Sequence, residues 1–210
     1  MKTIQLVQVN YQYGSNAYLP YSVGCLESSL RTNTELASHV VFRQPIFERH
    51  PISEQIKRIG SVDVLGLSCY IWNWEYSKAL GRLYREHHPH ALILVGGPQV
   101  PLHNRNLFTT DLDFADLAVV GEGEVAFSQV IENFVYGRSF KEIPGLLLPS
   151  GLLRSTVSTG EPIRIDDVAS LPSPYTSGVF DQLISGYPEL DFQVSQETHR
   201  GCPYSCTFCD

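Results

Sequence analysis

Three cysteines at the end of the chain have the spacing of a metal site. Cys202, Cys206 and Cys209 are separated by three and then two residues, so a tight loop can wrap their thiolates around one metal centre. Clusters held entirely by protein usually take four cysteines, but Cys25 and Cys69 lie more than a hundred residues earlier. Three thiolates leave one coordination position open, which distinguishes a catalytic metal centre from a closed structural one.

A structural zinc site is the alternative for this group of cysteines. His199 lies three residues before Cys202 and could complete a Cys3His ligand set. The residues around the first cysteine, 200–204 (RGCPY), are hard to explain by a zinc site. In a reducing cytosol, cysteines clustered in this way indicate metal rather than disulfides.

The composition is that of an ordinary globular protein and narrows the classes of partner. Of the 210 residues, 43% are hydrophobic and 18% are charged. We find neither an apolar run of the roughly 18 residues that span a membrane nor a signal-peptide pattern. The net charge is −7 without a block of Lys or Arg, so binding to nucleic-acid phosphates is not expected. We therefore expect a cytoplasmic protein without a membrane span.

Strand-like and helix-like stretches alternate along the first two thirds of the chain, which is typical of a parallel α/β sheet. The expected strands are 4–9, 39–47, 63–70, 91–97 and 117–121. Helices are expected at 21–31, 51–60 and 74–87, and around the periodic apolar residues Phe127, Val130, Ile131, Phe134 and Val135. Five parallel strands with right-handed crossovers predict an open, doubly wound, Rossmann-like sheet of flavodoxin-type order.

The pattern changes after about residue 144. Residues 146–157 predict a short hairpin, and residues 161–175 are rich in Pro, Asp and Ser, like a linker. A new strand at 192–198 then runs into the cysteine loop. We expect three segments: a sheet domain at 1–144, a hairpin and linker at 145–190, and the start of a second domain at 191–210.

A ligand of the sheet domain is expected at the carboxyl ends of the strands, because doubly wound sheets bind ligands where the strand order reverses. The segments at these ends are 10–16, 68–73, 96–101 and 121–123. Cys25 and Cys69 are best interpreted as small buried hydrophobic residues.

The cysteine loop resembles the cluster loop of radical SAM enzymes, whose motif is C-x-x-x-C-x-aromatic-C with Phe208 in the aromatic place. The resemblance implies that Cys202, Cys206 and Cys209 ligate a 4Fe-4S cluster. It also implies that the open iron chelates S-adenosylmethionine, that Phe208 lies near the adenine, and that an external electron donor reduces the cluster to generate a deoxyadenosyl radical.

The preceding sheet resembles the cobalamin-binding domain of cobalamin-dependent radical SAM enzymes, so the likeness covers about residues 3–209. The matching motifs occur in order, at 18–24, 67–70, 95–98 and 121–124. Glycines at two strand ends would let a flat macrocycle or its nucleotide tail approach the backbone. The resemblance implies cofactor contacts at Ser68, Tyr70, Gly96, Gly97, Pro98, Gly121, Glu122 and Gly123.

Each of these motifs also has a simpler interpretation. Gly96 and Gly97 fit a tight turn, and residues 121–123 fit a plain helix entry with acidic residues favoured by the helix dipole. Trp72 and Trp74 could be core residues rather than a platform for a corrin ring. Cobalamin domains with a histidine ligand to cobalt carry D-x-H-x-x-G after the first strand, whereas residues 10–16 read NYQYGSN. A cobalamin bound here is therefore expected to lack a histidine ligand.

The family resemblance implies an enzyme that transfers a methyl group, or performs related radical chemistry, on an unidentified small molecule or peptide. Because the sequence ends one residue after Cys209, we expect the N-terminal portion of a longer enzyme, inactive alone. Two alternatives remain open. One is a non-catalytic binding module with a structural metal at its terminal cysteines. The other is a radical SAM enzyme whose sheet domain no longer binds cobalamin.

Overall fold

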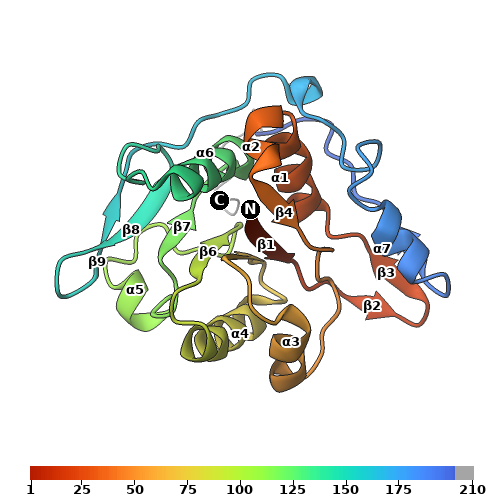
Figure 1. Cartoon of the computed structure of the whole chain (residues 1–210), viewed down its shortest axis with the longest axis horizontal. Helices are drawn as coiled ribbons and strands as arrows, with labels where there is room; N and C mark the ends of the chain where they lie inside the picture. Colours follow the sequence, from red (N-terminus) through yellow and green to blue (C-terminus); the bar gives the residue numbers. More distant parts are fainter. Residues whose placement is uncertain (202–210) are drawn as a thin grey trace.

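The computed structural model describes residues 1–201 and is built on a seven-stranded sheet (Figure 1). The strand order is β4-β1-β5-β6-β7-β8-β9. The first five of these strands are parallel: β4 (Val40–Phe42), β1 (Lys2–Val7), β5 (Val64–Ser68), β6 (Leu92–Gly96) and β7 (Leu117–Val119). Among these five strands, β1 lies between β4 and β5, the next two along the chain. This order confirms the predicted doubly wound, flavodoxin-type α/β sheet.

Helices cover both faces of the sheet, so the molecule has three layers (Figure 1). One face is covered by α1 (Tyr21–Arg31), α2 (Thr34–Ser38) and α6 (Gly123–Tyr136). The other face is covered by α3 (Ile52–Ile59), α4 (Trp74–His87) and α5 (Leu107–Thr110). The four longer helices were predicted, whereas the short α2 and α5 were not, because four or five residues carry too little periodicity.

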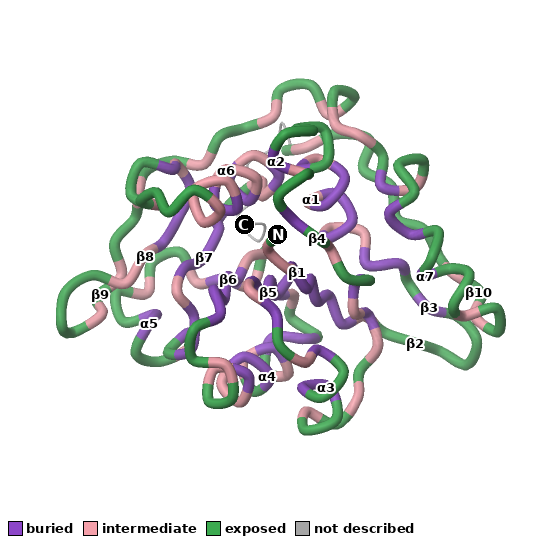
Figure 2. Tube along the Cα trace, viewed as in Figure 1, coloured by how far each residue is buried: buried purple, intermediate pink, exposed green. Residues whose placement is uncertain are grey.

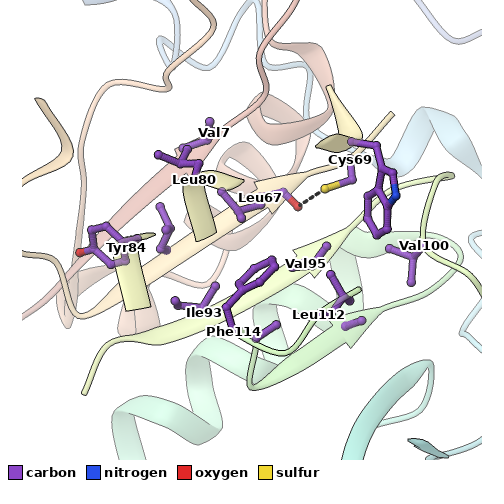
Figure 3. Close-up of a cluster of buried hydrophobic side chains, with 14 of the residues drawn as sticks. Val7, Leu67, Cys69, Leu80, Tyr84, Ile93, Val95, Val100, Leu112 and Phe114 are labelled. Atoms are coloured by element: carbon purple, nitrogen blue, oxygen red, sulfur yellow. Dashed lines mark hydrogen bonds between the residues drawn. The ribbon is translucent and has the colours of Figure 1, made fainter. Parts of the chain in front are cut away.

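Alternation of side chains along each strand divides the core of the main sheet into two clusters, and a third, smaller cluster forms around Phe47 and Phe180 beside the small sheet described below. On β5, Val64 packs with the residues beneath α1 and α6, whereas Leu65 and Leu67 pack beneath α4. Figure 3 shows the cluster beneath α4, which includes Leu67, Leu80 and Tyr84. Strands buried on both faces explain the nearly continuous apolar runs in the sequence. Figure 2 shows the corresponding buried centre and exposed rim.

The second strand is shorter than the predicted range of 39–47. Pro45 has no N–H to donate to a strand ladder, so β4 ends at Phe42. Ile46 then returns to the sheet as an isolated parallel bridge to Val7.

The predicted hairpin forms, but it is part of the main sheet. Its strands β8 (Leu146–Ser150) and β9 (Ser155–Ser158) are antiparallel, and β8 pairs with β7. The sheet therefore continues beyond residue 144, where the sequence pattern changes. An all-parallel sheet was expected, but hydrogen bonding along β7 extends it by two antiparallel strands.

A second, small sheet joins the start and the end of the described chain. The loop after β1 forms β2 (Gln12–Tyr13) and β3 (Asn16–Tyr18), which are antiparallel, and β10 (Asp191–Gln193) pairs with β3 in parallel. The strand predicted at 192–198 is thus limited to its beginning. It lies against the N-terminal region, together with α7 (Asp181–Gly186), whose Leu183 is buried.

Residues 161–175, predicted as a linker, contact the sheet domain. The backbone N–H of Ile165 donates to the Glu122 carboxylate at 2.9 Å, and the segment ends in the short 3-10 helix η1 (Val168–Ser170) and a turn region. The cysteine loop with Cys202, Cys206, Phe208 and Cys209 lies outside the described residues. Among residues 1–201, every helix is too short or too polar to cross a membrane.

Candidate ligand-binding cavity

The strand ends beneath α1 and α6 carry small residues. Because side chains alternate along a strand, Ser68 lies on the same face as the buried Val64, and Gly96 lies on the same face as Leu94. The neighbouring strand β7 is followed by Gly121. Small residues at three adjoining strand ends leave room on this face of the sheet.

A cavity of about 560 Å³ occupies that room, between the first turns of α1 and α6. Its volume lies within the roughly 300–1,000 Å³ typical of small-molecule sites. The structure places every described cofactor-contact residue expected from the sequence in the cavity lining: Ser68, Tyr70, Gly96, Gly97, Pro98, Gly121, Glu122 and Gly123. The cavity therefore lies at the strand ends, where the doubly wound topology predicts a ligand.

The two adjacent glycines of β6 have different reasons to be glycine. Gly97 has a φ of +106°, and a Cβ there would lie 2.4 Å from the carbonyl oxygen of Cys69. A Cβ on Gly96 would meet only the Val119 carbonyl oxygen and side chain, at 3.6 and 3.7 Å. Gly97 is thus required by the close approach of two strand ends, as a tight turn would require, whereas Gly96 leaves space in the cavity.

A chain of hydrogen bonds orients the hydroxyl of Ser68. The buried side-chain oxygen Oε1 of Gln8 accepts from the Ser22 hydroxyl at 2.7 Å and from the Ser22 backbone N–H at 3.0 Å. The Ser22 and Ser68 hydroxyl oxygens are 2.8 Å apart. Because the Ser22 proton is directed to Gln8, Ser68 donates to Ser22. Its lone pairs are then left to accept a hydrogen bond from a ligand in the cavity.

One wall of the cavity carries a cluster of charges around Arg200. Its guanidinium donates to Glu124 at 2.5 and 3.1 Å, to Glu122 at 2.9 Å and to Glu197 at 2.9 Å. These hydrogen bonds, led by the one to Glu124, raise the pKa of Arg200 further above its ordinary value. The Glu122 carboxylate, expected to face a ligand, is therefore held by Arg200 and by the Ile165 N–H.

Two uncharged side chains, Tyr21 and Cys25, line the cavity at the start of α1. Burial raises the pKa of the Cys25 thiol to about 11 and raises the pKa of Tyr21 as well, so both side chains are uncharged near neutral pH. Cys69, on the other face of the sheet, is also buried, and its pKa is raised to about 12 by burial. Both cysteines are the small buried residues that were predicted.

The aromatic residues after β5 divide between the core and the cavity rim. Trp74 is buried in the core beneath α4. The Tyr70 and Trp72 rings stack with centroids 4.5 Å apart and an interplanar angle of 8°, and the Trp72 indole donates to the Val9 carbonyl at 3.1 Å. Tyr70 lines the cavity, so the stacked pair forms a flat apolar edge beside it.

Several residues that line the cavity were not anticipated as ligand contacts. They come from the first turns of α1 and α6 and from the end of the described chain: Tyr21, Ser22, Cys25, Glu124, Glu197, His199 and Arg200. The residues on α1 and α6 could have been predicted from the topology, because the first turn of a helix that follows a strand lies above the carboxyl end of the sheet. No local pattern marks residues 197–200.

Comparisons with known proteins show what the sequence is similar to. Residues 34–131 match the family model described as the B12 binding domain. The chain is 34% identical over 205 residues to the cobalamin-dependent radical SAM methyltransferase TokK of Streptomyces tokunonensis. It is 35% identical over 206 residues to the 2-(S-pantetheinyl)-carbapenam-3-carboxylate methyltransferase of Streptantibioticus cattleyicolor. Each match covers 95% of this chain but only 30% of the relative.

Solved structures share the fold. The cobalamin-dependent S-adenosylmethionine radical enzyme OxsB, with aqua-cobalamin and S-adenosylmethionine bound, superposes with a TM-score of 0.76 at 21% identity, over 100% of this chain and 28% of OxsB. The methyltransferase TsrM of Kitasatospora setae gives 0.51 at 15% identity, over 82% of this chain and 31% of TsrM. Residues 34–131 therefore match a B12 binding domain, and the chain is similar, over nearly its whole length, to about a third of the length of cobalamin-dependent radical SAM methyltransferases.

Proposed function

We propose that this chain is the N-terminal portion of a cobalamin-dependent radical SAM enzyme that performs methyl transfer or related radical chemistry. In this proposal the cavity between α1 and α6 holds cobalamin. Cys202, Cys206 and Cys209 ligate a 4Fe-4S cluster that binds S-adenosylmethionine, with Phe208 beside its adenine. One observation carries the proposal: residues 197–201, directly before the cysteines, form part of the wall of the cavity at the strand ends of a B12-type domain.

The residues present fit a corrinoid. Gly96 and Gly121 expose backbone where a large planar group or its nucleotide tail can approach, and the Ser68 oxygen is oriented to accept a hydrogen bond from an amide or hydroxyl donor. When bound, cobalamin supplies a cobalt centre that can carry a methyl group. The first turns of α1 and α6 then enclose the ligand and exclude water.

The proposal includes no histidine ligand to cobalt from the loop after β1, because residues 10–16 contain no histidine. Residues 12–13 and 16–18 of that loop pair with one another as β2 and β3, away from the cavity lining. His103 is also absent from the residues that line the cavity, whereas His199 is among them. In electron paramagnetic resonance of the cobalt(II) form, we expect no splitting from an axial nitrogen. A splitting that is present in the wild type and lost in a His103→Ala variant would contradict this expectation.

Reconstitution tests the cobalamin site. The chain is incubated with hydroxocobalamin and separated from free cofactor by gel filtration, and bound corrin is measured from its visible absorption. We expect co-elution of corrin with the wild-type chain and at least a tenfold loss for Gly96→Val, because the added side chain enters the cavity. Ser155→Val, on the exposed strand β9, introduces the same side chain elsewhere and is expected to bind as the wild type does.

Two results would contradict the cobalamin site. One is a wild-type chain that retains no corrin, which would favour a sheet domain that has lost cobalamin binding. The other is a Gly96→Val variant that retains as much corrin as the wild type, which would place the cofactor elsewhere.

Anaerobic reconstitution with iron and sulfide tests the cluster. We expect iron and sulfide uptake, an absorption spectrum that changes when S-adenosylmethionine is added, and loss of both in Cys206→Ala. Stoichiometric zinc without iron uptake would instead support a structural metal site. An external electron donor and a cytoplasmic location belong to the same proposal, and the substrate is a small molecule or peptide bound outside this segment.

A further inference from the structure

Arg200 connects the chain that leads into the cysteine loop to the rim of the cavity. It lies two residues before Cys202, and its partners Glu122 and Glu124 lie at the first turn of α6, 78 and 76 residues earlier. The Arg200 side chain is 14% exposed, and those of Glu122 and Glu124 are 20% and 6% exposed. Two nitrogens of one guanidinium contact both oxygens of Glu124, which fixes orientation as well as distance.

This arrangement differs from the surface ion pair at the other end of the same helix. Arg138 and Glu132 lie 3.2 Å apart with side chains 59% and 37% exposed. Exposed pairs of this kind contribute little, because solvent screens them and both side chains lose freedom. In contrast, removing one partner of the Arg200–Glu124 pair would leave a nearly buried charge without compensation.

The segment before the cysteines has few other anchors. After β10 ends at Gln193, Ser195 exchanges hydrogen bonds with the Tyr175 hydroxyl, at 2.6 Å from its carbonyl and 3.0 Å from its N–H. Glu197, on the same segment, also accepts from Arg200. Glu122 joins this segment to residues 161–175 as well, because the same oxygen accepts from the Ile165 N–H.

We propose that Arg200 is a positioning residue, which latches residues 197–201 to the first turn of α6 and so fixes, at the rim of the cavity, the point from which the chain continues toward Cys202. The latch couples the two ends of the described chain. That it aligns a cluster with a cobalamin rests on the proposed function, whereas the latch itself does not.

Limited proteolysis of the chain without cofactors tests the latch. Trypsin must take the Arg200 side chain into its own pocket to cleave after it, so the ion pairs protect this bond. We expect cleavage after Arg200 to be at least tenfold faster in the double variant Glu122→Gln/Glu124→Gln than in the wild type. Glu132→Gln removes a carboxylate from the same helix and is expected to leave that rate unchanged.

Cleavage after Arg85, which lies on α4 and pairs with Asp116, reports general unfolding. If the double variant is cleaved faster at both sites, the single variant Glu122→Gln replaces it, since this side chain is the more exposed of the two. Equal rates after Arg200 in wild type and in every folded variant, or the same acceleration in Glu132→Gln, would overturn the latch.

A second measurement separates the latch from the proposed function. In chains reconstituted with hydroxocobalamin, we expect Arg200→Gln to lower the affinity for the corrinoid at least fivefold and Arg200→Lys to restore part of it, because Arg200 lines the cavity. Protection of Arg200 from trypsin with no corrin binding would sustain the latch and reject the cobalamin site. Corrin binding without protection of Arg200 from trypsin would support the cobalamin site and reject the latch.

Discussion

The two faces of the sheet differ most at the carboxyl ends of the same strands. Beneath α4, Leu67, Val95 and Val100 belong to one continuous cluster of buried side chains that also includes Cys69 (Figure 3). Beneath α1 and α6, the alternate positions carry Ser68 and Gly96, and a cavity of about 560 Å³ opens. Because neighbouring residues of one strand face opposite sides, a single pair such as Leu67 and Ser68 contributes to the packed core on one face and to the cavity on the other.

The helices above the two faces differ in the same sense. The inward face of α4 buries Leu80 and Tyr84, which fill the packed side. The inward face of α1 buries Glu27 and Ser28 beside its apolar residues, and its first turn contributes Ser22 to the cavity. The cavity therefore interrupts the apolar core of this face only at the strand ends, since Val64, Leu94 and Phe127 remain buried deeper under the same helices.

The largest effect is expected from the pair of adjacent glycines. Gly97→Ala places a Cβ 2.4 Å from the Cys69 carbonyl oxygen at a positive φ, and we expect a loss of about 3–6 kcal/mol in the free energy of unfolding. Gly96→Ala adds the same methyl group to the cavity side and should change stability by less than about 1 kcal/mol. Urea denaturation measures both. Equal losses would mean that the two faces are packed alike.

A second pair compares neighbouring side chains of β5. Leu67→Ala removes a side chain that is 2% exposed, and a loss of about 2–5 kcal/mol is expected from the cavity that it leaves. Ser68→Ala removes one hydrogen bond to Ser22 and should cost about 0.5–1.5 kcal/mol, while corrin binding weakens. If thermal unfolding showed the serine variant to be the less stable, Ser68 would be a packing residue rather than a ligand contact.

The smallest effect concerns the buried carboxyl group of α1. Burial raises the pKa of Glu27 from 4.5 to about 7, although Arg31 opposes this. Between these values the folded chain binds a proton that the unfolded chain has released, so the free energy of unfolding falls as pH rises from about 4.5 to 7. Glu27→Gln should remove this decline. At pH 8 we expect its free energy of unfolding to exceed that of the wild type by about 1 kcal/mol, which is below the roughly 1.4 kcal/mol that each unit of pKa shift can contribute.

Urea denaturation at pH 5 and pH 8 measures this difference. Ser29→Ala, a substitution without a titratable group on the same helix, serves as the control and should keep the wild-type pH dependence. A wild-type chain that is equally stable at both pH values, or a Glu27→Gln variant with an unchanged decline, would show that Glu27 ionises normally despite its burial.

The sequence by itself determined the elements of the main sheet and the edge at which the cavity lies. Helices α1 and α4 begin and end at the residues expected from the sequence, because a helix is formed by residues that are neighbours along the chain. The strand ends were recognisable for a similar reason, since a glycine or serine that interrupts an apolar run is visible in the sequence. The three-cysteine spacing likewise needs only eight consecutive residues, and its role stays a prediction.

Only the tertiary structure decided which distant side chains meet. The hydroxyl of Ser68 is oriented by Ser22 and Gln8, and no periodicity relates these three positions. β10 pairs with β3 across more than 170 residues, and Arg200 reaches Glu124 across 76. A hydrogen-bond or ion-pair partner at such a separation is chosen by how the layers stack. Local patterns predict on which face of a helix or strand a side chain lies, but not which residues it contacts.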